Sequence, residues 1–178
     1  MPHTTDAAMK IRLAKGEVIV GTEPVPGSNQ PRLVVRAMFD VPPEAVWKHI
    51  EDATKYAEFM PRVKSVQVLS RDGNDLIRTK LTVDMPFPLK NLSATTRAKH
   101  TVEPGVRYVR EWVLEEGDYH VNEGSWTLVP FDGDPNRALG VYRVHVVPKM
   151  PIPGVIQSAV QEKAMPKLIE ALRARSKK

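Results

Sequence analysis

The sequence predicts an α+β fold in which a curved antiparallel sheet of about seven strands wraps around a long C-terminal helix. Short strand-like segments with turn signals between them follow one another from Val63 to Val147, which is typical of an antiparallel meander. From Gly154 to Ser176, apolar residues recur at steps of three and four, the spacing of one helix face. Two short helical segments stand between the first clear strand and the meander.

The composition is that of an ordinary globular chain. With 178 residues, 42% of them hydrophobic and 26% charged, the chain is long enough for one domain with a substantial core. It has no cysteine, which excludes disulfides, thiol catalysis and thiolate metal sites. No apolar run reaches the ~20 residues that a membrane-spanning helix needs. Because the N-terminus shows no signal-peptide pattern, we expect the cytoplasm, or the periplasm if a leader has been removed.

The net charge of +5 does not indicate a nucleic-acid partner. Its lysines and arginines are not interleaved with aromatic side chains, as a platform for single strands requires. We expect Arg173, Arg175, Lys177 and Lys178 to form a solvated basic helix end, which the helix dipole favours. The oligomeric state stays open.

The chain is predicted to divide into an N-terminal extension, residues 1–31, and a main domain, residues 32–176. In the extension, Met1–Lys10 is expected to be frayed and Gly16–Thr22 is a possible extra strand. A loop rich in proline and glycine, Pro24–Pro31, then leads into the main domain.

The main domain is predicted to begin with a strand and two short helices. Apolar and other residues alternate along Leu33–Val41, and two prolines end that strand. Helical spacing follows at Glu44–Asp52 and at Thr54–Phe59. The meander then comprises Val63–Ser70, Leu76–Met85, Leu92–Val102, Val106–Glu116, Tyr119–Phe131 and Leu139–Val147.

In a meander, successive loops fall at alternate ends of the sheet. One end then collects the tight polar turns at 72–75, 103–105 and 132–136. The other end collects the loops at 85–89, 116–118 and 148–153, two of which are apolar and rich in proline. These two loops either pack together as a closed edge of the core or form the rim of an opening.

Strand alternation predicts a sheet that is apolar on one face only. The outer face is expected to be solvated and to carry Arg78, Lys80, Asp84, Arg97, Lys99, Arg107, Glu111, Glu115, Arg143 and His145. The inner face is expected to carry Ile77, Leu81, Val83, Met85, Ala94, Ala98, Val102, Tyr108, Trp112, Leu114, Trp126, Leu128, Tyr142, Val144 and Val146.

Two polar residues, His100 and Arg110, interrupt this inner face. We interpret His100 as a buried histidine with satisfied hydrogen bonds. For Arg110 two interpretations stay open. A bulge or an extended side chain places the charge outside, or the guanidinium meets internal water or the carboxylate or carbonyl of a ligand.

The closing helix is expected to lie on the apolar face along its whole length. Pro166 lacks an N–H donor, so a bend or a short break is predicted near Ala164–Pro166. Such a bend is compatible with a helix packed on a core and with a hinge over a cavity.

Short motifs along this order of elements resemble those of a known superfamily. They are Val41-Pro-Pro-Glu-Ala-Val-Trp47 with Tyr56-Ala-Glu-Phe-Met-Pro61, Gly124-Ser-Trp-Thr-Leu128, and Leu168-Ile-Glu-Ala-Leu-Arg173. From about Arg32 to Arg175 the chain resembles the START-like (SRPBCC) superfamily, in its polyketide cyclase/dehydrase and coenzyme Q-binding branch. The resemblance implies a helix-grip fold, in which the sheet and the long helix enclose a cavity for lipids, quinones or polyketides.

If such a cavity exists, its ligand-binding residues belong to the inner layer and the rim. The predicted set is Phe39, Phe59, Leu81, Val83, Met85, Phe87, His100, Tyr108, Arg110, Trp112, Trp126, Tyr142, Val144, Ile152, Ile156 and Val160. We predict no catalytic triad, no metal and no cofactor, because the sequence contains no nucleophile elbow, phosphate-binding glycine loop or metal-ligand spacing.

Three functions remain after these exclusions. The preferred one is binding or transport of a hydrophobic small molecule. The second is a cyclase or aromatase-like enzyme, in which His100, Arg110 and Tyr142 would supply acid–base groups. The third is an interaction module that touches a protein partner or, transiently, a membrane surface through its apolar loops and basic tail.

Overall fold

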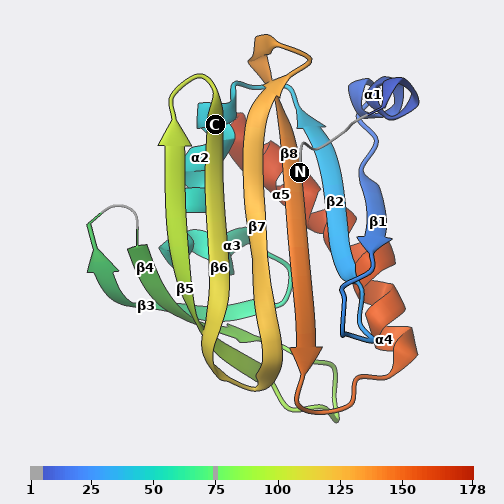
Figure 1. The fold of residues 1–178 in the computed structure, drawn as a ribbon, viewed down its shortest axis with the longest axis vertical. Coiled ribbons are helices and arrows are strands. Elements are labelled where there is room, and N and C mark those ends of the chain that lie inside the picture. The colour runs from blue at the N-terminus through green and yellow to red at the C-terminus, as the bar shows by residue number, and fades with distance from the viewer. Residues whose placement is uncertain (1–5, 74–75) are drawn as a thin grey trace.

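The computed structural model of the protein describes residues 6–73 and 76–178. These residues form one antiparallel sheet with the strand order β1-β2-β8-β7-β6-β5-β4-β3 (Figure 1). The strands are β1 (Ile19–Glu23), β2 (Arg32–Phe39), β3 (Val63–Asp72), β4 (Leu76–Val83), β5 (Leu92–Glu103), β6 (Arg107–Gly117), β7 (Tyr119–Phe131) and β8 (Asp134–Pro148).

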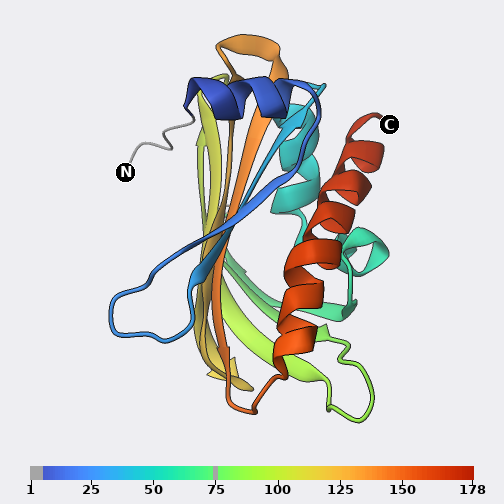
Figure 2. The same ribbon diagram turned by 90° about the vertical axis from the view of Figure 1, so that its right-hand side faces the viewer.

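The helices lie on both faces of the sheet. Figure 2 shows the C-terminal helix crossing the concave face beside α2, while α1 lies across the upper end of the sheet. The helical elements are α1 (Ala7–Ala14), α2 (Pro43–Glu51), the 3₁₀ turn Ala53–Lys55, α3 (Tyr56–Phe59), α4 (Gly154–Ala159), the π-helical turn Val160–Ala164 and α5 (Met165–Ser176).

This architecture confirms the predicted α+β class, with its curved antiparallel sheet, long C-terminal helix and short helices after the first main strand. Strands β3 to β8 are each hydrogen-bonded to the next, as a meander requires. Strand β2 pairs with β8 from Leu33 opposite Val144 to Phe39 opposite Ala138. The first main strand therefore lies beside the last one. The edge beyond β2 is occupied by β1, and the division of the chain at residue 31 stays a prediction.

The N-terminal segment is more ordered than its sequence predicts. We expected Met1–Lys10 to be frayed; residues 1–5 lie outside the described residues, but α1 begins at Ala7. Its N-cap is Asp6, whose Oδ1 accepts a 2.7 Å hydrogen bond from the Met9 N–H. The helix forms because Leu13 docks on the convex face of the sheet, where it is fully buried.

That docking creates a second apolar cluster, on the face of the sheet that we predicted to be solvated. Leu13 packs there with Ile19, Val34, Phe131, Leu139 and Val141. The prediction of a sheet that is apolar on one face only is therefore wrong over β2, β8 and β7. Alternation identified one apolar face, but β2 and β8 carry apolar residues on both.

The main core fills the concave side at one end of the sheet, which we call the core end. There, Phe39 and Leu128 of the sheet are buried together with Trp47 of α2 and Leu172 of α5. Two residues predicted for the inner layer are exposed: Val102 is 45% exposed and Val146 is 37% exposed. Val102 is close to the end of β5, where no helix covers it.

The closing helix bends without breaking. Pro166 stands at the start of α5, and the turn before it, Val160–Ala164, is π-helical. Proline has no N–H to donate to the preceding turn, and the wider π turn accommodates this missing hydrogen bond. The predicted interruption near Ala164–Pro166 is thus a π turn that ends where the interruption was expected.

Two of the four basic residues at the end of the chain, Arg173 and Arg175, are engaged within the fold and not solvated. Arg173 donates hydrogen bonds to the carbonyl oxygen of Met38 at 2.8 and 3.1 Å and to that of Gly16 at 3.1 Å. Arg175 donates to Glu58 at 3.1 Å. These arginines fasten α5 to the N-terminal segment, the sheet and α3, so the predicted solvated basic end is wrong for them, whereas Lys177 and Lys178 are exposed.

Candidate ligand-binding cavity

A cavity of about 440 Å³ lies between the concave face of the sheet and the C-terminal helix. Its volume is within the range of small-molecule sites, roughly 300–1,000 Å³. Side chains from β2, from β4 to β8, from the C-terminal helix and from the segment around Tyr56 form its wall. One end meets the main core. The other, which we call the loop end, is bordered by Met85, Pro148 and Ile152.

The strand register explains how the cavity is laid out. Arg110 pairs with Trp126, and Trp126 pairs with Tyr142, so these residues form one row across the sheet at the core end. The neighbouring row on the side away from the cavity includes Tyr108 and belongs to the solid core. Along β8, Pro148 at the loop end comes six positions after Tyr142, a rise of roughly 20 Å. The cavity wall is therefore elongated along the strands.

Aromatic rings form much of the wall. Tyr142 stacks on Trp126 with ring centroids 4.6 Å apart and on Trp112 with centroids 5.9 Å apart. Gly124 makes room for this stack, because a Cβ at that position would lie 2.6 Å from the Trp112 ring and would also collide with the Arg143 carbonyl. The glycine of the Gly-x-Trp-x-Leu motif is thus a packing requirement of the cavity wall.

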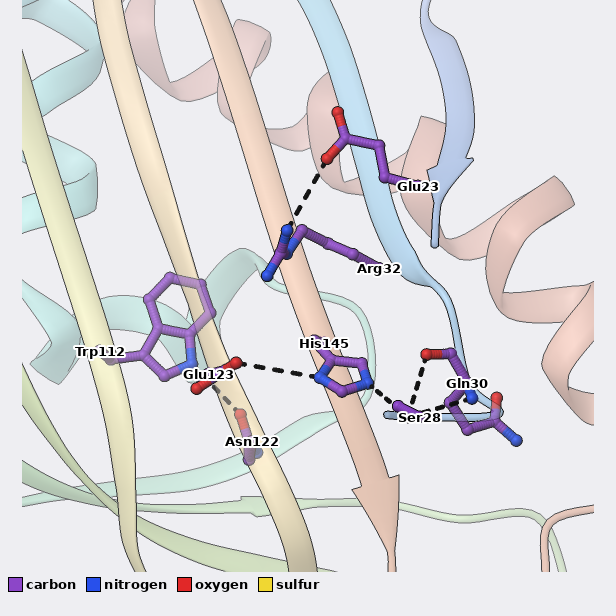
Figure 3. A network of polar contacts seen from close by, with 8 residues as sticks. All are labelled: Glu23, Ser28, Gln30, Arg32, Trp112, Asn122, Glu123 and His145. Carbon is purple, nitrogen blue, oxygen red and sulfur yellow. Dashed lines mark hydrogen bonds and ion pairs between the residues drawn. The ribbon is translucent and has the colours of Figure 1, made fainter. Parts of the chain in front are cut away.

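The polar groups of the wall are few. The Trp112 Nε1–H donates a 3.2 Å hydrogen bond to the Asn122 side-chain oxygen on the neighbouring strand (Figure 3). Thr79, which is 3% exposed, has a buried hydroxyl without a hydrogen-bond partner in the structure. Burial raises the pKa of Tyr119 to about 12 and raises that of Tyr142 well above its usual value. Both hydroxyls are therefore uncharged at neutral pH.

Arg110 points into the inner layer. The residue is 4% exposed, and its regular pairing with His100 and Trp126 excludes the bulge that would have turned it outward. Its Nη1 lies 2.7 Å from His100 Nε2, and its guanidinium carbon lies 5.7 Å from the centre of the Tyr56 ring. Burial raises the pKa of the Tyr56 hydroxyl, while the nearby Arg110 charge acts in the opposite direction.

His100 pairs with Arg110 on the neighbouring strand and does not line the cavity. It is 6% exposed and meets the Trp47 ring edge-on with centroids 5.1 Å apart. Its predicted burial is correct. It is not among the residues that line the cavity, and its contact with a ligand stays a prediction.

The loop 24–31 contributes to the wall of the cavity. Strand β2 ends its pairing with β8 at Val144, and the loop 24–31 continues past that point. Its Gln30 and Pro31 line the cavity. On the convex side, Ser28 Oγ lies 3.2 Å from His145 Nε2 (Figure 3).

His145 is therefore covered, although we predicted it on a solvated face. It is 2% exposed, and its Nδ1 faces Glu123 at 3.9 Å (Figure 3). Alternation placed the residue on the correct side of the sheet. However, alternation within a strand cannot predict that a loop more than a hundred residues earlier covers that side of the sheet.

Most of the predicted binding residues meet at the cavity wall. They are Leu81, Val83, Met85, Arg110, Trp112, Trp126, Tyr142, Val144, Ile152, Ile156 and Val160. That they bind a ligand stays a prediction.

The other predicted residues lie elsewhere. Phe39 and Tyr108 are buried in the main core, where the Tyr108 hydroxyl donates to Glu44 at 2.6 Å. Phe59 packs beneath the Arg175 guanidinium, 4.9 Å from its carbon, and Phe87 is 97% exposed. With His100, these are the predicted residues that do not line the cavity.

The predicted binding set also omitted a number of wall residues, although Ala94 and Val146 were expected on the inner face. Thr79 and Thr96 are in phase with predicted inner residues, so the two-residue period identifies them, but their polarity argued against burial. Gln30 and Tyr56 had no such signal. The missed residues are Gln30, Pro31, Leu33, Tyr56, Met60, Pro61, Arg62, Val63, Thr79, Leu92, Ala94, Thr96, Tyr119, Asn122, Val146, Pro148, Gln157, Ala164, Met165 and Leu168.

Two further tests concern the described residues alone. No group of histidine, aspartate and glutamate side chains there is arranged to hold a metal ion. Within residues 6–73 and 76–178, no helix combines the length and apolar character needed to cross a membrane.

The sequence of the chain matches the profile of one protein family. The profile of the family described as "Polyketide cyclase / dehydrase and lipid transport" matches residues 39–173. The chain belongs to this family. Among curated proteins, no sequence matches the chain.

Solved structures of this family's fold are similar over most of the chain. A STAR-related lipid transfer protein from Xanthomonas axonopodis is 19% identical with a TM-score of 0.76, covering 90% of this chain and 94% of that one. Human StAR-related lipid transfer protein 5 is 10% identical with a TM-score of 0.76, covering 96% of each chain. The Zhui aromatase/cyclase from Streptomyces is 16% identical with a TM-score of 0.64, covering 82% and 93%. At these identities the likeness shows the fold alone.

Proposed function

We propose that this protein binds and carries a hydrophobic small molecule in the cavity between its sheet and its C-terminal helix. One observation carries the proposal: a space of about 440 Å³ is kept open inside the fold by aliphatic and aromatic side chains. Protein interiors are close-packed, so an apolar space of this size is exceptional unless a ligand fills it.

Membership of the family supports the proposal. The family description includes lipid transport, and two similar structures are named as lipid transfer proteins. The wall also suits a carrier, because stacked rings such as Trp126 and Tyr142 offer wide apolar contact without a nucleophile. The ligands that we consider are lipids, quinones and polyketides.

A cyclase-like enzyme is the second candidate, and the contact between Arg110 and His100 favours it. A guanidinium 2.7 Å from an imidazole resembles an acid–base pair. However, His100 does not line the cavity, so of the three predicted acid–base residues a substrate would reach Arg110 and Tyr142. The carrier therefore remains the preferred function.

The exposed apolar residues at the loop end favour a transient contact with a membrane surface during loading or release. Phe87 is 97% exposed and Val155 is 77% exposed, and the segments that carry them lie at the same end of the molecule (Figures 1 and 2). Large apolar side chains with this exposure are typical of contact sites. Arg173 and Arg175 of the basic tail do not contribute, because they are engaged within the fold. The cytoplasmic compartment expected from the sequence stays a prediction.

The direct experiment is native mass spectrometry of the protein purified from its own host, followed by organic extraction of any bound molecule. We expect a stoichiometric hydrophobic compound that organic solvent releases. A second measurement covers the case in which purification strips the ligand. Delipidated protein is titrated with Nile red, a neutral hydrophobic dye, and its fluorescence is recorded.

A matched pair of variants makes the titration specific to the cavity. Ala94→Phe fills space at the wall, where Ala94 is 3% exposed, and is expected to weaken dye binding at least tenfold. Ala174→Phe makes the same change at an exposed position of α5 and is expected to leave binding unchanged. Equal binding by both variants, with circular dichroism confirming that both are folded, would show that the cavity is not the binding site.

A further inference from the structure

We infer that the ligand is an anionic amphiphile whose carboxylate meets Arg110 at the core end while its apolar tail extends toward the loop end. This inference rests on the proposed function and names the ligand class. It starts from a charge that the fold buries at the end of an apolar cavity.

The burial of Arg110 requires a compensating interaction. The residue is 4% exposed and stands between Tyr108 and Trp112 on the inner face of β6. A guanidinium stays protonated in proteins, so it cannot escape the cost of burial by losing its charge. A buried charge is tolerated when an opposite charge and hydrogen bonds accompany it.

The described part of the chain gives Arg110 an imidazole and an aromatic ring as partners, but no ion pair. The Arg110 guanidinium contacts His100 at 2.7 Å and lies over the Tyr56 ring, and no carboxylate of residues 6–73 or 76–178 forms an ion pair with it. More exposed arginines do have such partners, since Arg78 pairs with Glu115 at 2.7 Å. The arginine that most needs a carboxylate therefore lacks one.

The charges of the wall point to the same ligand class. Among the described residues that line the cavity, the charged side chains are Arg62 and Arg110, and no aspartate or glutamate is present. Such a wall attracts an anion. It offers no acidic partner for the cation of a zwitterionic head group, which would be left buried and unpaired.

The position of Arg110 sets the direction of the ligand. Its row, with Trp126 and Tyr142, closes the cavity against the solid core. From that row the wall runs roughly 20 Å along β8, and its residues toward the loop end, such as Met85 and Ile152, are apolar. The head group thus lies inside and the tail follows the strands.

Carboxylate is the acidic group that this end of the cavity fits best. Two parallel N–H groups of a guanidinium match the two oxygens of a carboxylate, which gives a short charge-assisted pair. The surrounding rings leave little polar area for the further oxygens of a larger head group. A single-chain carboxylic acid therefore satisfies both the charge at the core end and the apolar wall.

The test compares ligands that differ only in their heads. Delipidated wild-type protein is titrated with hexadecanoic acid, methyl hexadecanoate and hexadecan-1-ol by displacement of Nile red at pH 8 and low ligand concentration. The three chains bury the same apolar surface, so any preference comes from the head group. We expect the acid to bind at least tenfold more tightly than the ester or the alcohol. Equal or weaker binding of the acid would overturn the inference.

Variants then assign the preference to Arg110. Arg110→Met is expected to reduce the preference for the acid to less than about threefold, and Arg110→Lys to keep part of it. Arg97→Met, an exposed arginine on the neighbouring strand, is the matched control and is expected to keep the full preference. An Arg110→Met variant that folds and still prefers the acid would refute the assignment. If that variant does not fold, Arg110→Lys and the wild-type series decide.

The same titrations separate the two proposals. If all three compounds bind the wild-type protein equally well, the carrier function stands and the acidic head group is wrong. If the wild-type protein binds neither the dye nor any of the three compounds, the carrier function itself is wrong.

Discussion

The core end and the loop end of the concave face are made of the same strands and the same C-terminal helix, yet one is solid and the other hollow. At the core end, α2 packs against α5 and against β6, β7 and β8. At the loop end, α4 has no comparable packing with any strand of the described chain. Two helices fill the curve of the sheet, whereas one helix bridges it and leaves a space. The alternation of apolar residues is similar in both regions, so coverage decides between core and cavity.

The largest expected difference between the two ends is the cost of removing a leucine. Leu172→Ala, at a fully buried core-end position, is expected to lower the free energy of unfolding by about 2–5 kcal/mol. Leu81→Ala, at the cavity wall, should cost about 1 kcal/mol, because that side chain already borders empty space. Urea denaturation of delipidated protein measures both. Similar losses would mean that the loop end is as tightly packed as the core end.

A smaller effect is expected at the glycine that makes room for the aromatic wall. Gly124→Ala places a methyl group 2.6 Å from the Trp112 ring and should cost about 1–3 kcal/mol of stability while weakening dye binding. Gly21→Ala in β1 meets no atom within 4 Å and serves as the control. A Gly124→Ala protein with normal stability and dye affinity would show that the ring stack is free to shift.

Two tyrosine hydroxyls sharpen the comparison further. Tyr108→Phe removes the 2.6 Å hydrogen bond to Glu44 at the core end and is expected to cost about 1 kcal/mol. Tyr142→Phe removes a hydroxyl that faces the cavity and should change stability by less than about 0.5 kcal/mol. Thermal denaturation of both variants, side by side, checks the order. The reverse order would place the more important hydrogen bond inside the cavity.

The smallest effect concerns alkaline pH. Burial raises the pKa of Tyr119, at the loop end, from 10.0 to about 12, so the folded state holds its proton more tightly than the unfolded state. This contribution to stability is fully present below about pH 10 and is lost as the pH rises from about 10 to 12. Tyr119→Phe should therefore reduce the loss of stability between pH 9 and pH 11 by under about 1 kcal/mol. Urea midpoints at the two pH values measure it. An unchanged slope would place the Tyr119 hydroxyl in water.

Much of this fold follows from local patterns in the sequence. The strands between Val63 and Pro148 and the helical stripe after Gly154 were predictable because each depends on a period of two or about 3.6 residues. The inward position of Trp112, Trp126 and Tyr142 follows from the same period. Local periodicity sets which face of an element is apolar, and a family resemblance then orders the elements.

The tertiary structure decided what covers each face. Ser28 covers His145 across 117 residues, and Arg173 reaches the Gly16 carbonyl across 157 residues. No local period contains such contacts, which is why Met1–Lys10 was expected to be frayed and the position of the predicted loop 24–31 on the sheet was not foreseen. The sequence by itself determined that Arg110 interrupts an apolar layer. Only the packing of α2 at one end, and its absence at the other, placed that charge where the solid core stops and the cavity begins.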